Sequence, residues 1–137
     1  MRPLAIVLAA LVLVTGRAEA LGPVTQTFAA STDRVWNVTH AVLKQLGWDI
    51  DKEDRSIGML TTDSRRVDGE DYGVYAKGVR HRLQIQLKAL DNARTSVTIE
   101  RSVFERERIL FVDNDKPLTA KDQEVEKSVL AAIGRAL

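Results

Sequence analysis

The chain has 137 residues, with 20 Lys and Arg against 19 Asp and Glu, so its formal charge is close to zero. This balance argues against a protein that binds a nucleic-acid backbone, because such proteins concentrate an excess of Lys and Arg. The chain has no cysteine, which excludes a disulfide framework, a cysteine nucleophile and an acyl anchor on an N-terminal cysteine.

Residues 1–20 have the pattern of a secretory signal peptide. Arg2 supplies a positive charge, residues 4–14 form an unbroken apolar run, and residues 18–20 read Ala-Glu-Ala. A run of this length, at about 1.5 Å per residue, spans only half of a hydrocarbon core about 30 Å thick, so it is too short for a membrane anchor. We predict cleavage after Ala20, which leaves residues 21–137 as one unlipidated domain that is periplasmic or secreted.

The first part of this domain reads as a strand followed by a helix. Residues 24–28 alternate apolar and polar side chains, as a strand does. Ser31 can cap a helix, and Gly47 fits the left-handed position that follows one. We therefore expect a strand over 24–28 and a helix over about 32–46, whose apolar stripe is formed by Val35, Val38, Val42 and Leu46.

After this helix the period of the apolar residues changes from 3.6 to 2, which predicts a β-hairpin. One alternating run covers 48–51, a second covers 57–62, and the polar residues 52–56 lie between them. Asp49 and Asp51 fall on the solvated side of the first run.

Residues 65–77 contain Gly69 and Gly73 and show no clear period, so we interpret them as a loop or an irregular hairpin tip. The strand that follows has the clearest alternation in the chain, since its odd-numbered residues from Val79 to Ala89 are mostly apolar and its even-numbered ones are polar. One buried face and one wet face are typical of an antiparallel sheet covered on a single side.

Residues 91–94 read as a turn into a strand that puts Val97 and Ile99 on the same buried face. Residues that face each other on the two strands must point to the same side of the sheet, so their numbers have an even sum. An odd number of residues then lies between the last facing pair, which predicts a loop of three or five residues. Phe104 breaks this parity and predicts a bulge near 102–104.

The end of the chain reads as one further short strand and a last helix. The apolar run 109–112 is a candidate strand, and Thr119 is a candidate cap for a helix with the stripe Val125, Val129, Ala132, Ile133 and Ala136. Together these elements predict an α+β fold of the order β-α-β-β-β-β-α. Its two helices cover one face of an antiparallel sheet of about five to six strands.

Two acidic segments resemble the start of a calcium-binding loop. Such a loop needs a glycine at its sixth position for a sharp turn. Counted from Asp49 the sixth residue is Asp54, and counted from Asp113 it is Leu118. We expect no metal site, and we interpret the charges of the first segment as the wet face and tip of the hairpin.

No catalytic motif is recognisable in the sequence. The chain has two histidines, His40 and His81, and neither a G-x-S-x-G elbow nor an HExxH sequence. We expect His81 to be a partly buried, hydrogen-bonded residue of the sheet. The residue inventory predicts a non-enzymatic protein without a cofactor.

The segment 65–78 is the candidate contact surface. Arginine and tyrosine are favoured at interface anchors, and Arg80 and Arg82 follow close by. The alternative is a solvated loop whose arginines pair with acidic neighbours, namely Asp63, Asp68, Glu70 and Asp71. The candidate partner-binding residues are Arg65, Arg66, Tyr72 and Tyr75.

Residues 31–63 resemble the opening of the BamC-like domains, in which a capped helix with a Val-Trp pair ends in Leu-Gly. A hairpin with Gly-x-Leu/Ile-Thr-Thr follows in that family. The resemblance implies a helix-grip fold and an accessory role in the machine that assembles outer-membrane β-barrels, and it implies no catalytic residues. The family's namesake is a lipoprotein with two such domains, whereas this chain has room for one and has no cysteine. The matching residues are Val35, Trp36, Leu46, Gly47, Asp54, Gly58, Leu60, Thr61 and Thr62.

We therefore expect a periplasmic, non-enzymatic protein that binds another protein or complex of the cell envelope through its exposed sheet face or the segment 65–78. The alternative is a carrier that holds a lipid or another small apolar ligand between helix and sheet. A solidly packed core favours the binding protein. An open cavity favours the carrier, and its lining would be Trp36, Val42, Leu83, Ile85 and Val129.

Overall fold

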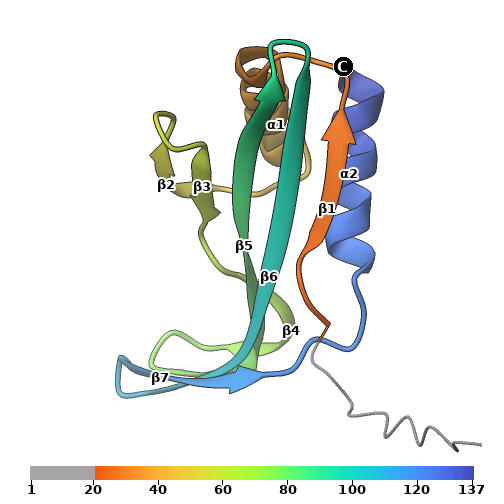
Figure 1. The fold of residues 1–137 in the computed structure, drawn as a ribbon. Coiled ribbons are helices and arrows are strands. Elements are labelled where there is room, and N and C mark those ends of the chain that lie inside the picture. Colours follow the sequence, from red (N-terminus) through yellow and green to blue (C-terminus); the bar gives the residue numbers. More distant parts are fainter. Residues whose placement is uncertain (1–20) are drawn as a thin grey trace, which may run out of the picture.

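The computed structural model describes residues 21–137, and the predicted signal peptide with its cleavage site lies outside the described residues. The described chain forms two helices and an antiparallel sheet, which confirms the predicted α+β class (Figure 1). The sheet has seven strands and not the predicted five to six, because residues 65–71 and 112–118 also form strands. In chain order the elements are β1 (Val24–Phe28), α1 (Thr32–Gln45), β2 (Ile50–Asp54), β3 (Met59–Thr62), β4 (Arg65–Asp71), β5 (Tyr75–Asp91), β6 (Arg94–Ile109), β7 (Val112–Leu118) and α2 (Glu124–Ala136).

The long hairpin of β5 and β6 is shared by two parts of the sheet. At one end it is flanked by β1 and β3, in the order β1-β6-β5-β3-β2. At the other end β4 pairs with β5 and β7 pairs with β6. We call the first part, with both helices, the body, and the second part, residues 65–82 and 102–118, the arm. In Figure 1 the arm lies across the lower end of the long hairpin, away from α1.

The hydrophobic core lies in the body, between one face of the sheet and the two helices. The predicted inward residues Leu83, Ile85 and Ile99 are fully buried there. Val35 and Leu43 of α1 and Val129 and Ile133 of α2 pack against them in one cluster. Both helices therefore cover the same side of the sheet, as predicted.

Helix α1 is the predicted first helix and ends one residue earlier than expected, at Gln45. The Ser31 hydroxyl accepts a hydrogen bond from the Arg34 amide at the N-terminus. Gly47 has a φ of +82°, the left-handed conformation that ends a helix at low cost in glycine. Within residues 21–137, no helix combines the length and apolar character that a bilayer crossing requires.

The predicted pairing of the two longest strands is confirmed, but the predicted bulge in the second is wrong. Ile85 faces Ile99, so facing residues have numbers with an even sum. The predicted loop of three or five residues is wrong, because only residues 92 and 93 lie between the paired Asp91 and Arg94, and a register shift next to Leu90 accounts for the even sum. Phe104 keeps the regular register opposite Arg80. It is buried on the helix-free side, because the guanidinium of Arg82 covers its ring at 4.9 Å.

Residues 65–71 form strand β4, so their interpretation as a loop is wrong and the alternative of an irregular hairpin is right. The strand has a register shift after Arg66 and is exposed along most of its length. Gly69 faces Gly78, and a Cβ atom on Gly69 would approach the Lys77 carbonyl oxygen to 2.2 Å. The backbone ladder holds this strand, so it needs no apolar alternation.

Two expectations for the C-terminal part are also wrong. The run 109–112 is the tip of the β6–β7 hairpin and not a separate strand. Helix α2 begins at Glu124 and not after Thr119. The Asp122 carboxylate accepts from the Glu124 amide at this end, while the N-cap Gln123 makes no capping hydrogen bond.

Candidate functional site

The four residues predicted to bind a partner lie in three different places. Tyr72 and Tyr75 are exposed at the tip of the β4–β5 hairpin. Arg66 lines a hollow in the arm. Arg65 lies on the opposite side of β4, where its guanidinium covers the Trp48 ring at 3.9 Å. The prediction treated the four as one surface, and strand alternation separates them.

Arg65 contributes to a polar cluster at the edge of the core. Its guanidinium donates to the Leu46 carbonyl at 2.9 Å and to Nε2 of His81 at 3.4 Å. His81 is buried beside Trp48, with ring centroids 4.8 Å apart. Burial lowers the pKa of His81 to about 4, and the nearby charges of Arg101 and Arg65 act in the same direction. His81 is therefore neutral at pH 7, and it is the hydrogen-bonded residue of the sheet that the sequence predicted, although it is more deeply buried than expected.

The stability of the protein is expected to depend on His81 between about pH 6.5 and pH 4. The unfolded chain binds the proton near the ordinary histidine pKa of about 6.5, and the folded chain binds it near 4. Because the unfolded state holds more protons in this window, the free energy of unfolding falls as the pH falls through it. Urea denaturation at several pH values should show a smaller loss for His81→Gln than for the natural protein. An equal loss in both would contradict the assignment.

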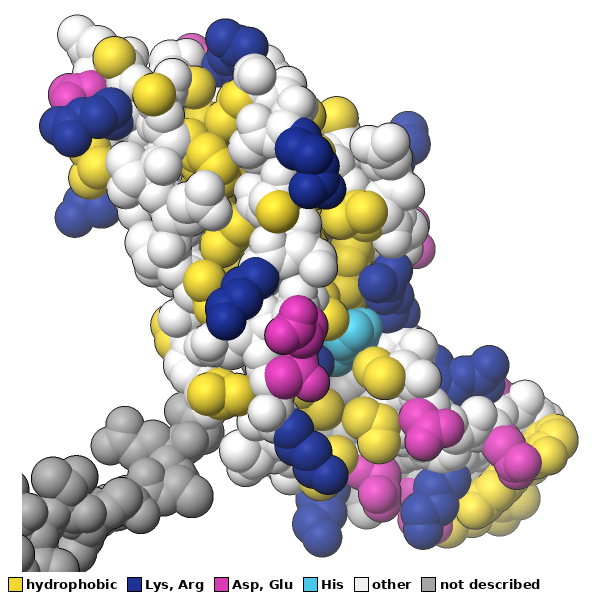
Figure 2. Space-filling model, turned by 90° about the vertical axis from the view of Figure 1, so that its right-hand side faces the viewer, with side chains coloured by type: hydrophobic (Ala, Val, Ile, Leu, Met, Phe, Trp, Pro, Cys, Tyr) yellow, Lys and Arg dark blue, Asp and Glu magenta, His cyan; other side chains and the backbone are white. Residues whose placement is uncertain are grey.

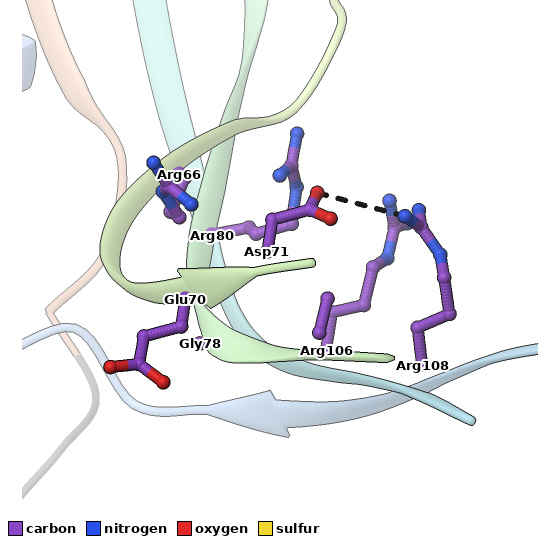
Figure 3. A pocket seen from close by; sticks show the side chains of 8 residues that line it. Arg66, Glu70, Asp71, Gly78, Arg80, Arg106 and Arg108 are labelled. Carbon is purple, nitrogen blue, oxygen red and sulfur yellow. Dashed lines mark ion pairs between the residues drawn. The ribbon is translucent and has the colours of Figure 1, made fainter. Parts of the chain in front are cut away.

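Four arginines line a small hollow on the helix-free side of the arm (Figure 3). They are Arg66 of β4, Arg80 of β5, and Arg106 and Arg108 of β6. The alternation of the strands explains the convergence, since even-numbered residues of β5 and β6 share this side. In Figure 3 their guanidinium groups lie on the same side of the sheet as Asp71, and the Glu70 carboxylate points away.

Two of these arginines are held by carboxylates. Arg106 donates two hydrogen bonds to Asp115, at 2.8 and 3.0 Å. Arg108 donates to Asp113 at 2.7 Å and lies 3.6 Å from Asp71. The hydrogen bonds to Asp115 and Asp113 raise the pKa of Arg106 and of Arg108, respectively. The acidic run considered as a calcium loop thus forms ion pairs.

No group of three or more residues in 21–137 has the composition and placement of a metal site. The first acidic segment is the exposed hairpin that was predicted, and its Asp54 accepts from the Ser56 amide in the turn. The second histidine of the chain, His40, lies on α1 with its Nε2 2.6 Å from the Glu53 carboxylate. This pair joins the helix to β2 at the surface.

The tip of the arm gathers exposed apolar side chains from two hairpins. The β4–β5 turn and the β6–β7 turn lie side by side, because Tyr75 faces Ile109 and the Phe111 amide donates to the Val74 carbonyl at 3.4 Å. In Figure 2 hydrophobic side chains stand at the outer end of the lower part of the molecule, beside charged ones. The apolar tip, each side chain 43–74% exposed, consists of Tyr72, Val74, Tyr75, Ile109, Leu110, Phe111 and Val112.

The two residues of the β6–β7 turn have backbone conformations that are unfavourable for their residue types. Leu110 and Phe111 have φ values of +51° and +66°. Two-residue hairpin turns of this kind favour Asn and Gly, because other L-residues are strained at positive φ. Both side chains are also more than 70% exposed. Neither the backbone conformation nor local packing therefore explains why Leu and Phe occupy positions 110 and 111.

Sequence reasoning missed the apolar tip and the paired arginines Arg106 and Arg108. The run Ile-Leu-Phe-Val contains none of the usual turn residues, so it read as a strand. Its length held no signal either, since a run of four apolar residues is within the range of a buried strand. No protein-family model matches the chain, and a comparison with curated proteins found no match.

Proposed function

We propose that this protein is a non-enzymatic binding module of the cell envelope that docks another envelope protein through the apolar tip of its arm. The observation that carries the proposal is the exposure of seven apolar side chains on two adjacent hairpin turns. The resemblance of residues 31–63 to BamC-like domains supports an accessory role in outer-membrane assembly, and the signal-peptide pattern supports a periplasmic location.

Exposed apolar clusters usually mark interaction sites, because water favours their burial. Here the cluster lies at the outermost end of a sheet extension, where it adds nothing to the core of the body. The strained turn at Leu110 and Phe111 supports the same conclusion, since local strain is retained where function requires it. Aromatic side chains such as Tyr72 and Phe111 are favoured anchors in protein interfaces.

The charges directly beside the tip are paired with one another, which supports a protein partner. Beside the tip Arg108 is paired with Asp113, and Lys77 lies 4.0 Å from Glu107. An apolar centre with a rim of mixed charges is the usual composition of a protein–protein interface.

The carrier alternative requires space between the helices and the sheet. The five residues expected to line such a cavity are at most 5% exposed and belong to the single packed core cluster. An open hollow of about 240 Å³ lies beside Trp48 and Val125 at the edge of the body. This is smaller than the roughly 300–1,000 Å³ of typical ligand pockets. We therefore prefer the binding role.

Site-specific photocrosslinking in the native envelope tests the proposal. A photoreactive residue at Phe111 is expected to give a discrete protein adduct, and adding Leu110→Ser and Tyr72→Ser in the same chain is expected to reduce its yield about tenfold or more. The reason is that truncating interface anchors costs at least about 1–2 kcal/mol each. Mass spectrometry of the adduct identifies the partner.

A crosslinker at Ile57 is the matched control. Ile57 is also an exposed apolar residue at a hairpin turn, 59% exposed, but it lies in the body. Adducts of equal yield from both positions, or only lipid adducts from Phe111, would contradict the proposal. Lipid extraction of the purified protein provides the further test, since a stoichiometric apolar molecule would support the carrier.

A further inference from the structure

The helix-free side of the arm carries more positive than negative charge. Arg82 and Arg106 both cover the ring of Phe104, at 4.9 and 5.4 Å, so Arg82 belongs to the same surface as the arginines of the hollow. With the carboxylates that line the hollow or pair with its arginines, the five arginines stand against four acidic groups, a surplus of 5 − 4 = 1 positive charge. The surface consists of Arg66, Arg80, Arg82, Arg106, Arg108, Glu70, Asp71, Asp113 and Asp115.

Arg80 has hydrogen bonds but no ion pair on this surface. Its guanidinium donates to the hydroxyl and the carbonyl oxygen of Ser64, at 2.9 and 2.8 Å, and both acceptors are neutral. Within residues 21–137 no carboxylate lies in ion-pair range of it. Burial lowers the pKa of Arg80, the positive charges of Arg106, Arg108 and Arg66 lower it further, and the negative charge of Asp71 acts in the opposite direction.

The neighbours of Arg80 are positioned before any ligand arrives. The bidentate pair with Asp115 fixes Arg106, and the pair with Asp113 fixes Arg108. Arg66 makes no side-chain hydrogen bond or ion pair within the part of the chain that the structure describes. Because Arg106 and Arg108 are already fixed and Arg66 is free to donate, these arginines bind an anion at a lower entropic cost than a set of flexible side chains does.

The hollow itself is small and chemically selective. Its volume of about 20 Å³ is room for about one water-sized atom, so one oxygen of a bound group enters it while the rest of the group stays at its mouth. Arginine forks match the geometry of phosphate and carboxylate oxygens. A phosphate group with a free second ionisation carries a charge of about −1.5 to −2 at pH 7. This charge matches Arg66 and Arg80, the two arginines of the hollow that have no ion pair within residues 21–137, whereas a carboxylate leaves one of them unmatched.

We propose that this hollow binds a phosphate group, with Arg66 and Arg80 as donors and Arg106 and Arg108 as fixed positive neighbours. The phosphate is free or belongs to a lipid headgroup. The site is independent of the apolar tip, so it holds whether or not the tip docks a protein.

Calorimetric titration of the exported protein with inorganic phosphate, at ionic strength held constant with chloride, tests the site. The natural protein is expected to bind one phosphate saturably. Arg80→Gln and Arg66→Gln are each expected to weaken binding about tenfold or more, because each removes a charge-assisted hydrogen bond. Arg34→Gln is the matched control, since Arg34 is an exposed arginine of α1 in the body. It is expected to bind phosphate as the natural protein does.

Arg66→Gln separates loss of binding from loss of folding. It removes no hydrogen bond or ion pair of the described residues, so it should leave the thermal midpoint unchanged.

Cosedimentation with phosphatidylcholine vesicles, with and without phosphatidic acid, distinguishes the sources of the phosphate. Binding that requires phosphatidic acid and is lost in Arg66→Gln assigns a lipid headgroup, and titration by inorganic phosphate without vesicle binding assigns a soluble phosphate. Absence of saturable phosphate binding, or equal weakening in Arg34→Gln, overturns the proposal. Phe111→Ser is expected to leave phosphate binding unchanged, which separates this site from the tip.

Discussion

Glu126→Ala is expected to destabilise the protein by about 3 kcal/mol, because it leaves a buried guanidinium with only the exposed Asp122 carboxylate, 3.4 Å away, as its counter-charge. The side chains of Glu126 on α2 and Arg101 on β6 are 3% and 9% exposed, and Arg101 Nε donates to the Glu126 carboxylate at 2.7 Å. The pair joins the last helix to the sheet. Arg101 also donates to the Asp122 carbonyl at 2.9 Å, so it stays in place after the substitution.

Urea denaturation measures this effect, and the double variant supplies its control. Glu126→Leu combined with Arg101→Leu is expected to be close to the natural protein in stability, since replacing both partners of a buried pair by apolar residues is often neutral or stabilising. Glu126→Ala alone should therefore be less stable than the double variant. A loss below about 1 kcal/mol for the single variant would show that water or Asp122 compensates the charge of Arg101.

The fold of the body could be predicted from the sequence, because each element there buries one face. Burial of Leu83, Ile85 and Ile99 requires period-2 alternation, and burial of Val35 and Leu43 requires the helical stripe. The even-sum pairing of the long hairpin was predicted for the same reason, since a shift by one residue would turn the whole apolar face to water. The loop length derived from it was wrong, because a register shift next to Leu90 allows a two-residue turn.

The arm could not be predicted in this way, because it has little core. Strand β4 is held by its backbone ladder with β5, and the side chains along it are mostly exposed. The environment of Phe104 could not be predicted for the same reason. It is buried by arginine side chains on the side of the sheet that is exposed to solvent in the body. An amphipathic pattern cannot indicate a surface whose burial depends on guanidinium groups.

The candidate site was predicted only in part for a related reason. Tyr72 and Tyr75 do lie on the exposed tip, and Arg66 does lie in the hollow. Arg65 is one residue from Arg66 and lies on Trp48 instead, because neighbouring side chains of a strand point to opposite faces. The contribution of β6 and β7 depends on pairing between residues far apart in sequence, which no local pattern encodes.

Leu110→Asn together with Phe111→Gly is expected to stabilise the arm while it removes two side chains of the tip. An ordinary L-residue in the left-handed region costs about 1–2 kcal/mol, and Asn and Gly are the residues that such a turn favours. Since Leu110 and Phe111 are 73% and 74% exposed, the substitution loses little packing. We expect a gain of about 2 kcal/mol in the free energy of local opening of the β6–β7 hairpin.

Hydrogen exchange of the amides of β7 measures this gain, as exchange about 30-fold slower than in the natural protein. Amides of β1, in the body, serve as the internal reference. The proposed function adds a second requirement, namely that crosslinking from Tyr72 to the envelope partner falls in the same variant. If the strained turn is retained for binding, the variant should be more stable and should bind the partner more weakly. Faster exchange in β7 would mean instead that Leu110 and Phe111 hold the arm together, and the apolar tip would then be part of the fold.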